Sequence, residues 1–165
     1  MLTVTATGGV TLDTKVASAL VTTTAAGSID IDETDTIRLV DISTHNGNID
    51  VTAGDINVNT VVAGGPGDVN LHSADAIIGN GTGATDVTGN LLTASAANAI
   101  NLDTTVAIAN VESTSSGAVS IDETDHLTLQ QVFTADGPIT VNAGGKLTAT
   151  LVDSSTTQSD ANDIL

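Results

Sequence analysis

The sequence predicts an all-β fold, a right-handed parallel β-helix, on three observations. These are a long internal repeat, a shorter period of about 20 residues inside it, and an apolar complement of small and β-branched side chains. Residues Thr11–Gly54 align without a gap on Asn101–Gly144, 90 positions later, and 21 of the 44 positions are identical. Units repeated at one fixed offset are typical of solenoids, in which each unit packs only on its neighbours. Right-handed winding is the expected hand for parallel strands joined by crossovers.

The composition favours a narrow interior over a wide globular core. The chain has 165 residues, a single aromatic residue, Phe133, and no Cys. Compact domains usually bury large aromatic rings in their cores. Here Ala, Val, Leu and Ile supply nearly all the apolar mass, beside many Thr, Asp, Gly and Asn residues. Regular alternation of the apolar residues argues against disorder.

The shorter period consists of a Gly, or Asn98 in one unit, followed at the second and fourth positions by Val, Ile or Leu, with the register one residue shorter after Gly9. Stacking these units predicts two interior columns of like side chains, with each strand hydrogen-bonded to its equivalent one coil away. The first column is Val10, Ile29, Ile49, Val69, Ile100, Val119 and Ile139; the second is Leu12, Ile31, Val51, Leu71, Leu102, Ile121 and Val141.

Each period contains two alternating runs that have the pattern of strands, about eight coils in all. Examples are residues 28–32 and 36–42, then 48–52 and 55–61. The Asn46-Gly47 and Asp136-Gly137 pairs are expected at corners between these runs, because Gly tolerates tight turns. The step from Val69 to Ile100 is longer, 31 residues, and is interpreted as a coil with a Gly-rich loop at residues 79–83 and an extra short strand.

The chain is predicted to be one solenoid segment over residues 1–165. Residues 1–90 form a first long repeat, and residues 91–165 form a partial second repeat. Met1–Leu12 resembles Leu91–Leu102, so the chain opens within a repeat, and Ile164–Leu165 resembles the start of another strand. An excerpt from a longer array would have these features.

The order of these elements supports a resemblance to a known family. A Gly-x-Ile-x-Ile run, a corner of Thr and Asp, a second alternating strand and an Asn-Gly pair follow one another in residues 27–47. This order resembles the filamentous-haemagglutinin-like repeats of large secreted bacterial surface and adhesin proteins. The resemblance implies a right-handed β-helix, an extracellular or cell-surface location and a role in adhesion or filament formation.

The charge excludes several classes of partner. The net charge is −17, and the only basic residues are Lys15, Arg38 and Lys146. A nucleic-acid interface needs many Lys and Arg residues to neutralise phosphates, so nucleic acid is not an expected partner. No apolar run reaches the ~18 residues of a membrane-spanning helix, so membrane insertion is not expected either. Divalent cations are compatible with so acidic a chain.

Two acidic clusters are candidates for calcium binding. Oxygen ligands crowded into a few residues suit Ca²⁺, although the spacing is not that of an EF-hand. The alternative is that these carboxylates are solvated and accept hydrogen bonds from nearby backbone amides, as turn residues often do. No other cofactor is expected. The candidate ligands are Asp32, Glu33 and Asp35 in the first repeat and Asp122, Glu123 and Asp125 in the second.

Catalysis is the weaker alternative. Asp32 and Asp35 are a possible acid–base pair for a carbohydrate-acting enzyme, since glycosidases use two carboxylates. Sugar-binding grooves usually contain aromatic platforms, and only Phe133 is available. Arg38, a group that would stabilise negative charge, is replaced by Thr128 in the second copy. No catalytic residues are therefore assigned.

The function expected from the sequence is structural. The chain is predicted to be a stalk or spacer segment of a large extracellular repetitive protein, without catalytic activity. The alternatives are a carbohydrate-acting enzyme of the same fold and a calcium-stabilised adhesive repeat. Like segments are the expected partners, joined end to end, and a surface glycan or protein receptor would bind other parts of the parent protein.

Overall fold

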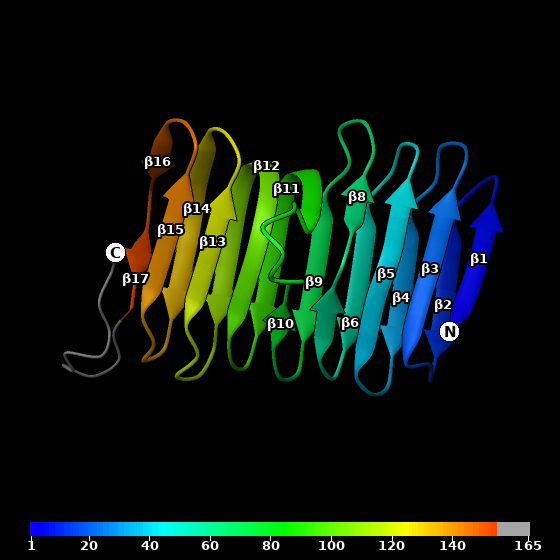
Figure 1. Cartoon of the computed structure of the whole chain (residues 1–165), viewed down its shortest axis with the longest axis horizontal. Coiled ribbons are helices and arrows are strands. Elements are labelled where there is room, and N and C mark those ends of the chain that lie inside the picture. Colours follow the sequence, from blue (N-terminus) through cyan, green and yellow to red (C-terminus); the bar gives the residue numbers. More distant parts are fainter. Residues whose placement is uncertain (155–165) are drawn as a thin grey trace.

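The computed structural model describes residues 1–154. These residues form seventeen strands and no helix, so none of them belongs to a helix that could cross a membrane. The strands wind into a β-solenoid of about eight turns, roughly 20 residues apart (Figure 1). They are β1 (Leu2–Ala6), β2 (Val10–Thr14), β3 (Ser18–Thr23), β4 (Ile29–Glu33), β5 (Ile37–Thr44), β6 (Ile49–Ala53), β7 (Ile56–Val58), β8 (Val61–Ala63), β9 (Val69–Ser73), β10 (Ile77–Ile78), β11 (Val87–Ala96), β12 (Ile100–Ser113), β13 (Val119–Glu123), β14 (Leu127–Thr134), β15 (Ile139–Ala143), β16 (Leu147–Ala149) and β17 (Val152–Asp153).

The strands form two ladders of parallel pairs, one on each face of the solenoid. The first ladder, here called the front ladder, contains β1, β3, β5, β7, β8, β10, the start of β11, the start of β12, β13 and β15. The back ladder contains β2, β4, β6, β9, the end of β11, the end of β12, β14, β16 and β17. Figure 1 shows the ladders running along the long axis, with the N-terminus at one end.

The interior is aliphatic, as predicted. In β4, Ile29 and Ile31 are buried, whereas Asp30 and Asp32 are exposed. This is the alternation expected of a strand with one face in the core and one face exposed to solvent. The same pattern recurs along both ladders. The largest fully buried side chains are all Ile or Leu: Ile29, Ile31, Ile37, Leu39, Ile42, Ile49, Ile56, Leu71, Ile77, Leu92, Ile100 and Leu102.

Glycines recur at the corners because successive coils touch there through their backbones. A Cβ added at Gly117 would overlap the backbone of Asn98, and one added at Gly137 would overlap the carbonyl group of Gly117. No side chain fits between coils at this corner. The predicted corner pairs, Asn46-Gly47 and Asp136-Gly137, do connect strands of opposite faces and not strands of a hairpin.

The predicted interior columns are wrong at one step. Val69 does not stack on Ile100; it pairs with Leu92 of β11. Ile100 instead pairs with Ile77 on one side and Val119 on the other. The second predicted column breaks in the same way, since its members Leu71 and Leu102 pair with Ala94 and Ile121 respectively.

The reason is that β11 is longer than predicted and turns from one face to the other. Its start, Val87–Thr88, pairs with β8 in the front ladder, and its end, Leu92–Ala96, pairs with β9 in the back ladder. The 31-residue step therefore covers about one and a half coils. In the part of the chain after this step, the strands that follow a corner glycine lie on one face of the solenoid. Their equivalents before the step lie on the opposite face.

This offset makes the 90-residue repeat about four and a half coils long, at roughly 20 residues per coil. Equivalent strands of the two copies consequently lie on opposite faces. β4 belongs to the back ladder, and its equivalent, β13, belongs to the front ladder. The two copies of the internal repeat are therefore related by a translation along the solenoid axis combined with a half turn about it.

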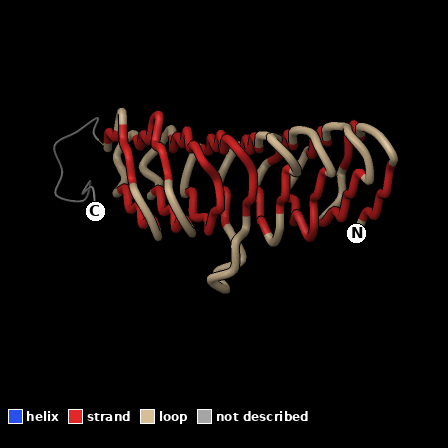
Figure 2. Tube along the Cα trace, turned by 90° about the horizontal axis from the view of Figure 1, so that it is seen from above, coloured by secondary structure: helices blue, strands red, loops and turns tan. Residues whose placement is uncertain are grey.

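A loop at residues 79–86 interrupts the regular coils between β10 and β11. Figure 2 shows it projecting from the middle of the solenoid. It contains the Gly-rich residues 79–83, as predicted.

The first coil leaves apolar side chains partly exposed. Val4, Ala6 and Leu12 of β1 and β2 pack against the core without being buried. At the other end, Leu147 and Leu151 are 42% and 49% exposed. The strand predicted to begin at Ile164–Leu165 lies outside the described residues.

Candidate functional site

The first acidic cluster surrounds a buried glutamate, Glu33, the last residue of β4. The Glu33 carboxylate accepts hydrogen bonds from Thr14 Oγ1 at 2.6 Å and from the Val16 backbone N–H at 2.7 Å. Its second oxygen accepts a bond from the Asp35 backbone N–H at 3.3 Å. Thr14 and Val16 belong to the preceding coil, so Glu33 ties two successive corners together.

The second cluster contains the same arrangement. Glu123, the buried last residue of β13, accepts bonds from Thr104 Oγ1 at 2.8 Å, from Val106 N–H at 2.9 Å and from Asp125 N–H at 3.3 Å. All four residues are the 90-residue equivalents of those around Glu33. We call each arrangement a glutamate clamp: a buried Glu whose carboxylate binds a Thr hydroxyl and two backbone N–H groups.

The clamp favours the ionised form of Glu33. Burial by itself raises the pKa of the carboxyl, but the hydrogen bonds from Thr14, Val16, Asp35 and Thr34 together outweigh it. The net effect is a pKa lowered from its ordinary value. A carboxylate held in this way acts as an acceptor for the corner of the neighbouring coil.

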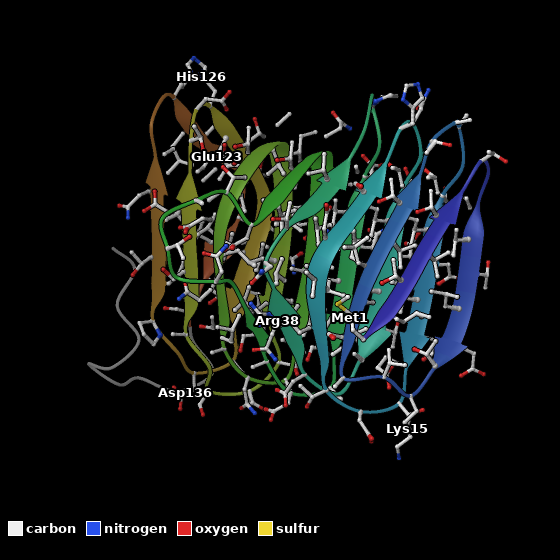
Figure 3. The ribbon with its side chains drawn as sticks, turned by 45° about the vertical axis from the view of Figure 1, so that its right-hand side comes forward. Met1, Lys15, Arg38, Glu123, His126 and Asp136 are labelled. Carbon is white, nitrogen blue, oxygen red and sulfur yellow. The ribbon has the colours of Figure 1, made fainter. Side chains whose placement is uncertain are left out.

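The aspartates of the two clusters point to solvent. Asp32, Asp35, Asp122 and Asp125 are exposed, and Asp35 Oδ2 lies 3.1 Å from Lys15 Nζ in an exposed ion pair. The clusters lie at opposite edges of the solenoid, which Figure 3 shows through Lys15 at one edge and Glu123 at the other. The six calcium candidates are thus not brought together into one site.

No metal site is evident at either edge. Among residues 1–154, no group of three or more His, Asp or Glu side chains has a geometry that could hold a metal ion. Both glutamates direct their oxygens to protein donors in this structure. Calcium binding by the exposed aspartates stays a prediction.

Sequence reasoning missed a third acidic group, which anchors the 79–86 loop. The Asp86 side chain is buried, and its two oxygens accept hydrogen bonds from the backbone N–H groups of Asn80 and Asp103, each at 3.0 Å. A Cβ added at Gly79 would overlap this carboxylate. Asp86 follows a run of Gly and Thr residues, where an acidic residue has the pattern of an ordinary solvated turn residue.

Crowding of carboxylates changes the acidity of Asp103. Burial raises the pKa of Asp103, and the nearby carboxylates of Asp86 and Asp122 raise it further. A backbone hydrogen bond from Gly83 opposes these effects without cancelling them. Asp103 is therefore held at an unfavourable position for a charged group.

A hollow lies beside the 79–86 loop, on the front ladder. It is a groove of about 610 Å³, and residues of successive coils and of the loop line it. None of these lining residues is a carboxylate, so the acid–base pair predicted for a carbohydrate-acting enzyme, Asp32 and Asp35, lies elsewhere. The lining residues are Ala17, Thr36, Arg38, Asn57, Val58, Asn59, Ile78, Gly79, Asn80 and Thr82.

Comparisons with known proteins add no relative. No protein-family model matches the chain, and searches of the curated proteins and of the solved structures find no match. The resemblance to filamentous-haemagglutinin-like repeats therefore continues to depend on the order of sequence elements alone.

Proposed function

We propose that this chain is a structural stalk or spacer segment of a large extracellular, adhesin-like repetitive protein, without catalytic activity. The observation that carries the proposal is the pair of parallel ladders that run through all the described coils around an aliphatic interior. Each inner coil hydrogen-bonds to the coils on both sides, so bending the rod would break many bonds at once. Such a rod holds whatever it carries at a fixed distance.

The corners contribute to this stiffness. Glutamate clamps connect adjacent coils through the side chains of Glu33 and Glu123. Corner glycines remove the side chains that would separate the coils at Gly117 and Gly137. Interactions of this kind serve a spacer, because they hold successive coils in one relative position.

A non-catalytic role is also supported by the lining of the groove described above. An enzyme that hydrolyses glycosidic bonds needs two carboxylates at a fixed separation across its substrate groove. The groove beside the 79–86 loop is lined by Arg, Asn and Thr side chains and by no carboxylate of the described residues. We assign no cofactor to the stalk.

Like segments joined end to end are the proposed partners. Within residues 1–154, β1 and β2 of the first coil each pair with strands on one side only, β3 and β4. Their outer edges offer backbone donors and acceptors to a further coil. A coil of a like segment has the matching ladder and the matching aliphatic interior.

Rigidity can be measured by double electron–electron resonance between two spin labels, since the chain has no native Cys. Thr3→Cys on β1 and Asn142→Cys on β15 are exposed positions of the front ladder. Seven coil steps of ~4.8 Å separate them, which predicts a distance near ~34 Å. A stalk predicts one narrow distribution around this value.

A distribution spread over tens of ångströms in the folded protein would contradict a rigid spacer. The same pair in denaturant gives the broad reference distribution. If the purified chain instead released reducing ends from a polysaccharide, the carbohydrate-acting alternative would replace the stalk.

A further inference from the structure

The groove beside the 79–86 loop has the size and the lining of a small-molecule site. Its volume of about 610 Å³ lies within the roughly 300–1,000 Å³ typical of ligand pockets. Its polar groups are hydrogen-bond donors or amides and hydroxyls that both donate and accept. These groups belong to Thr36, Arg38, Asn57, Asn59, Asn80 and Thr82.

Arg38 is available to a ligand. Its Nη2 donates to Asn59 Oδ1 at 3.0 Å, and among residues 1–154 it takes part in no ion pair, although the chain has 20 acidic residues. Nearby Asp55 is occupied, because its oxygens accept bonds from Thr36 Oγ1 at 3.1 Å and from the Ala76 N–H at 3.3 Å. The remaining guanidinium N–H groups form a planar fork that matches a carboxylate.

The fold does not require these particular side chains. In the second copy of the repeat, the strand register places Thr128, Thr148 and Thr150 at the positions of Arg38, Asn57 and Asn59. The interior positions on either side of Arg38 keep their apolar character in both copies, and all four of their side chains are buried: Ile37 and Leu39 in the first, Leu127 and Leu129 in the second. The groove chemistry is thus a separate feature added to a common coil.

The wall of the groove is held in place. Asp86 binds the backbone of Asn80 and Asp103, as described above, and Asn80 Nδ2 donates to the Asn59 backbone oxygen at 3.0 Å. These bonds fix the start and the end of the loop against two different coils. A preformed wall lowers the entropy that a ligand must remove on binding.

We infer that this groove binds the carboxylate of a small polyhydroxylated molecule, of the sugar-acid class. The Arg38 fork pairs with the carboxylate, while the amides of Asn57 and Asn59 and the hydroxyl of Thr36 exchange hydrogen bonds with ligand hydroxyl groups. Without a carboxylate among its described lining residues, the groove is a local exception on a chain of net charge −17. The inference does not depend on the stalk function.

Binding can be tested by titrating the ¹⁵N-labelled chain with three probes at physiological ionic strength, where long-range repulsion is screened beyond ~8 Å. D-gluconate has both a carboxylate and hydroxyls, sorbitol has hydroxyls only, and acetate has a carboxylate only. Gluconate is expected to shift the amide signals of residues 36–38, 57–59 and 79–82 in a saturable way, and to bind about tenfold more tightly than either other probe.

The variants take their residues from the second copy, so that folding is preserved. Arg38→Thr and Asn59→Thr should each weaken gluconate binding, the first by about tenfold. Two control variants lie outside the groove: Lys15→Thr removes one positive charge, and Thr128→Arg adds one in the second copy. Neither should change the affinity for gluconate or the set of residues whose amide signals shift. Equal binding by Arg38→Thr and the wild type, shifts outside the groove, or binding of sorbitol or acetate as tight as that of gluconate would overturn the inference.

Discussion

The two copies of the repeat share their clamps and differ in their outward surface. Glu33 and Glu123 bind equivalent donors at nearly equal distances, although β4 lies on the back ladder and β13 on the front ladder. Arg38 and Thr128, equally equivalent, have no chemistry in common. The donors of a clamp lie in its own coil and the coil before it, so the same contacts form whichever face of the solenoid the strand lies on. Surface residues have no such local constraint.

Breaking the interior should have the largest effect, and the same effect in both copies. Ile31→Asp and Ile121→Asp each place an unpaired charge among buried aliphatic side chains, which should lower the free energy of unfolding by several kcal/mol. Asp30→Asn, on the exposed side of the same strand, should change it by less than about 0.5 kcal/mol. Chemical denaturation measures all three, and equal tolerance at Ile31 and Asp30 would refute the assignment of the faces.

Removing a clamp should have the next largest effect. Glu33→Ala and Glu123→Ala each leave a Thr hydroxyl and two backbone N–H groups without their acceptor, which should lower the free energy of unfolding by about 1–3 kcal/mol. Asp32→Ala, at the exposed neighbouring position, is the matched control and should have little effect. A large difference between the two Glu variants would show that the faces are not equivalent.

The clamp also predicts a pH dependence. Because the pKa of Glu33 is lowered on folding, its contribution to stability is complete above the pKa of the unfolded chain, near ~4.3, and is lost as pH falls through the folded pKa. Glu33→Gln should therefore flatten the acid limb of the stability curve. An unchanged curve would mean that the ionised form is not preferred.

Asp103 should have the smallest effect on stability, and its ionised form should destabilise the fold, whereas that of Glu33 stabilises it. Its pKa is raised on folding, so its charge destabilises the protein above the folded pKa, and this penalty disappears as pH falls toward the unfolded value near ~3.9. Asp103→Asn should raise the melting temperature slightly at pH 7 and leave it unchanged at pH 3. Asp13 is the equivalent residue of the first copy and is exposed, so Asp13→Asn is the matched control. A lower melting temperature for Asp103→Asn at pH 7 would contradict the unfavourable charge.

The coil and its interior were predictable because they depend on local pattern. Alternation of Ile and Asp in residues 29–32 predicts one buried and one exposed side, and the corner glycines mark where the strands end. The solenoid, its eight or so turns and its aliphatic interior all follow from that pattern. The same reasoning places Asp32 and Asp35 at a corner, where the structure leaves them exposed.

The half turn and the groove were not predictable in this way. The stacking of Ile100 on Ile77 depends on how many half coils residues 70–99 form. That number is determined by the length of β11, which passes from one face to the other and which the sequence pattern does not specify. Glu33 and Glu123 resemble solvated turn residues, because their donors in the preceding coil are 17 to 19 positions earlier. The groove combines residues of successive coils and the 79–86 loop, which no single period of the sequence brings together.

Disulfide formation between introduced cysteines shows whether the repeat advances by a half-integral number of coils. In the structure Asn70 pairs with Thr93 on the back ladder, and Asn101 pairs with Ile78 on the front ladder. Oxidation of the Asn70→Cys/Thr93→Cys and Ile78→Cys/Asn101→Cys variants should give intramolecular disulfides, because each pair lies on adjacent strands at one register position. The Asn70→Cys/Asn101→Cys variant should stay reduced as a monomer. Ready closure of that last pair, with failure of the first two, would contradict the half turn and restore the continuous columns that the sequence predicts.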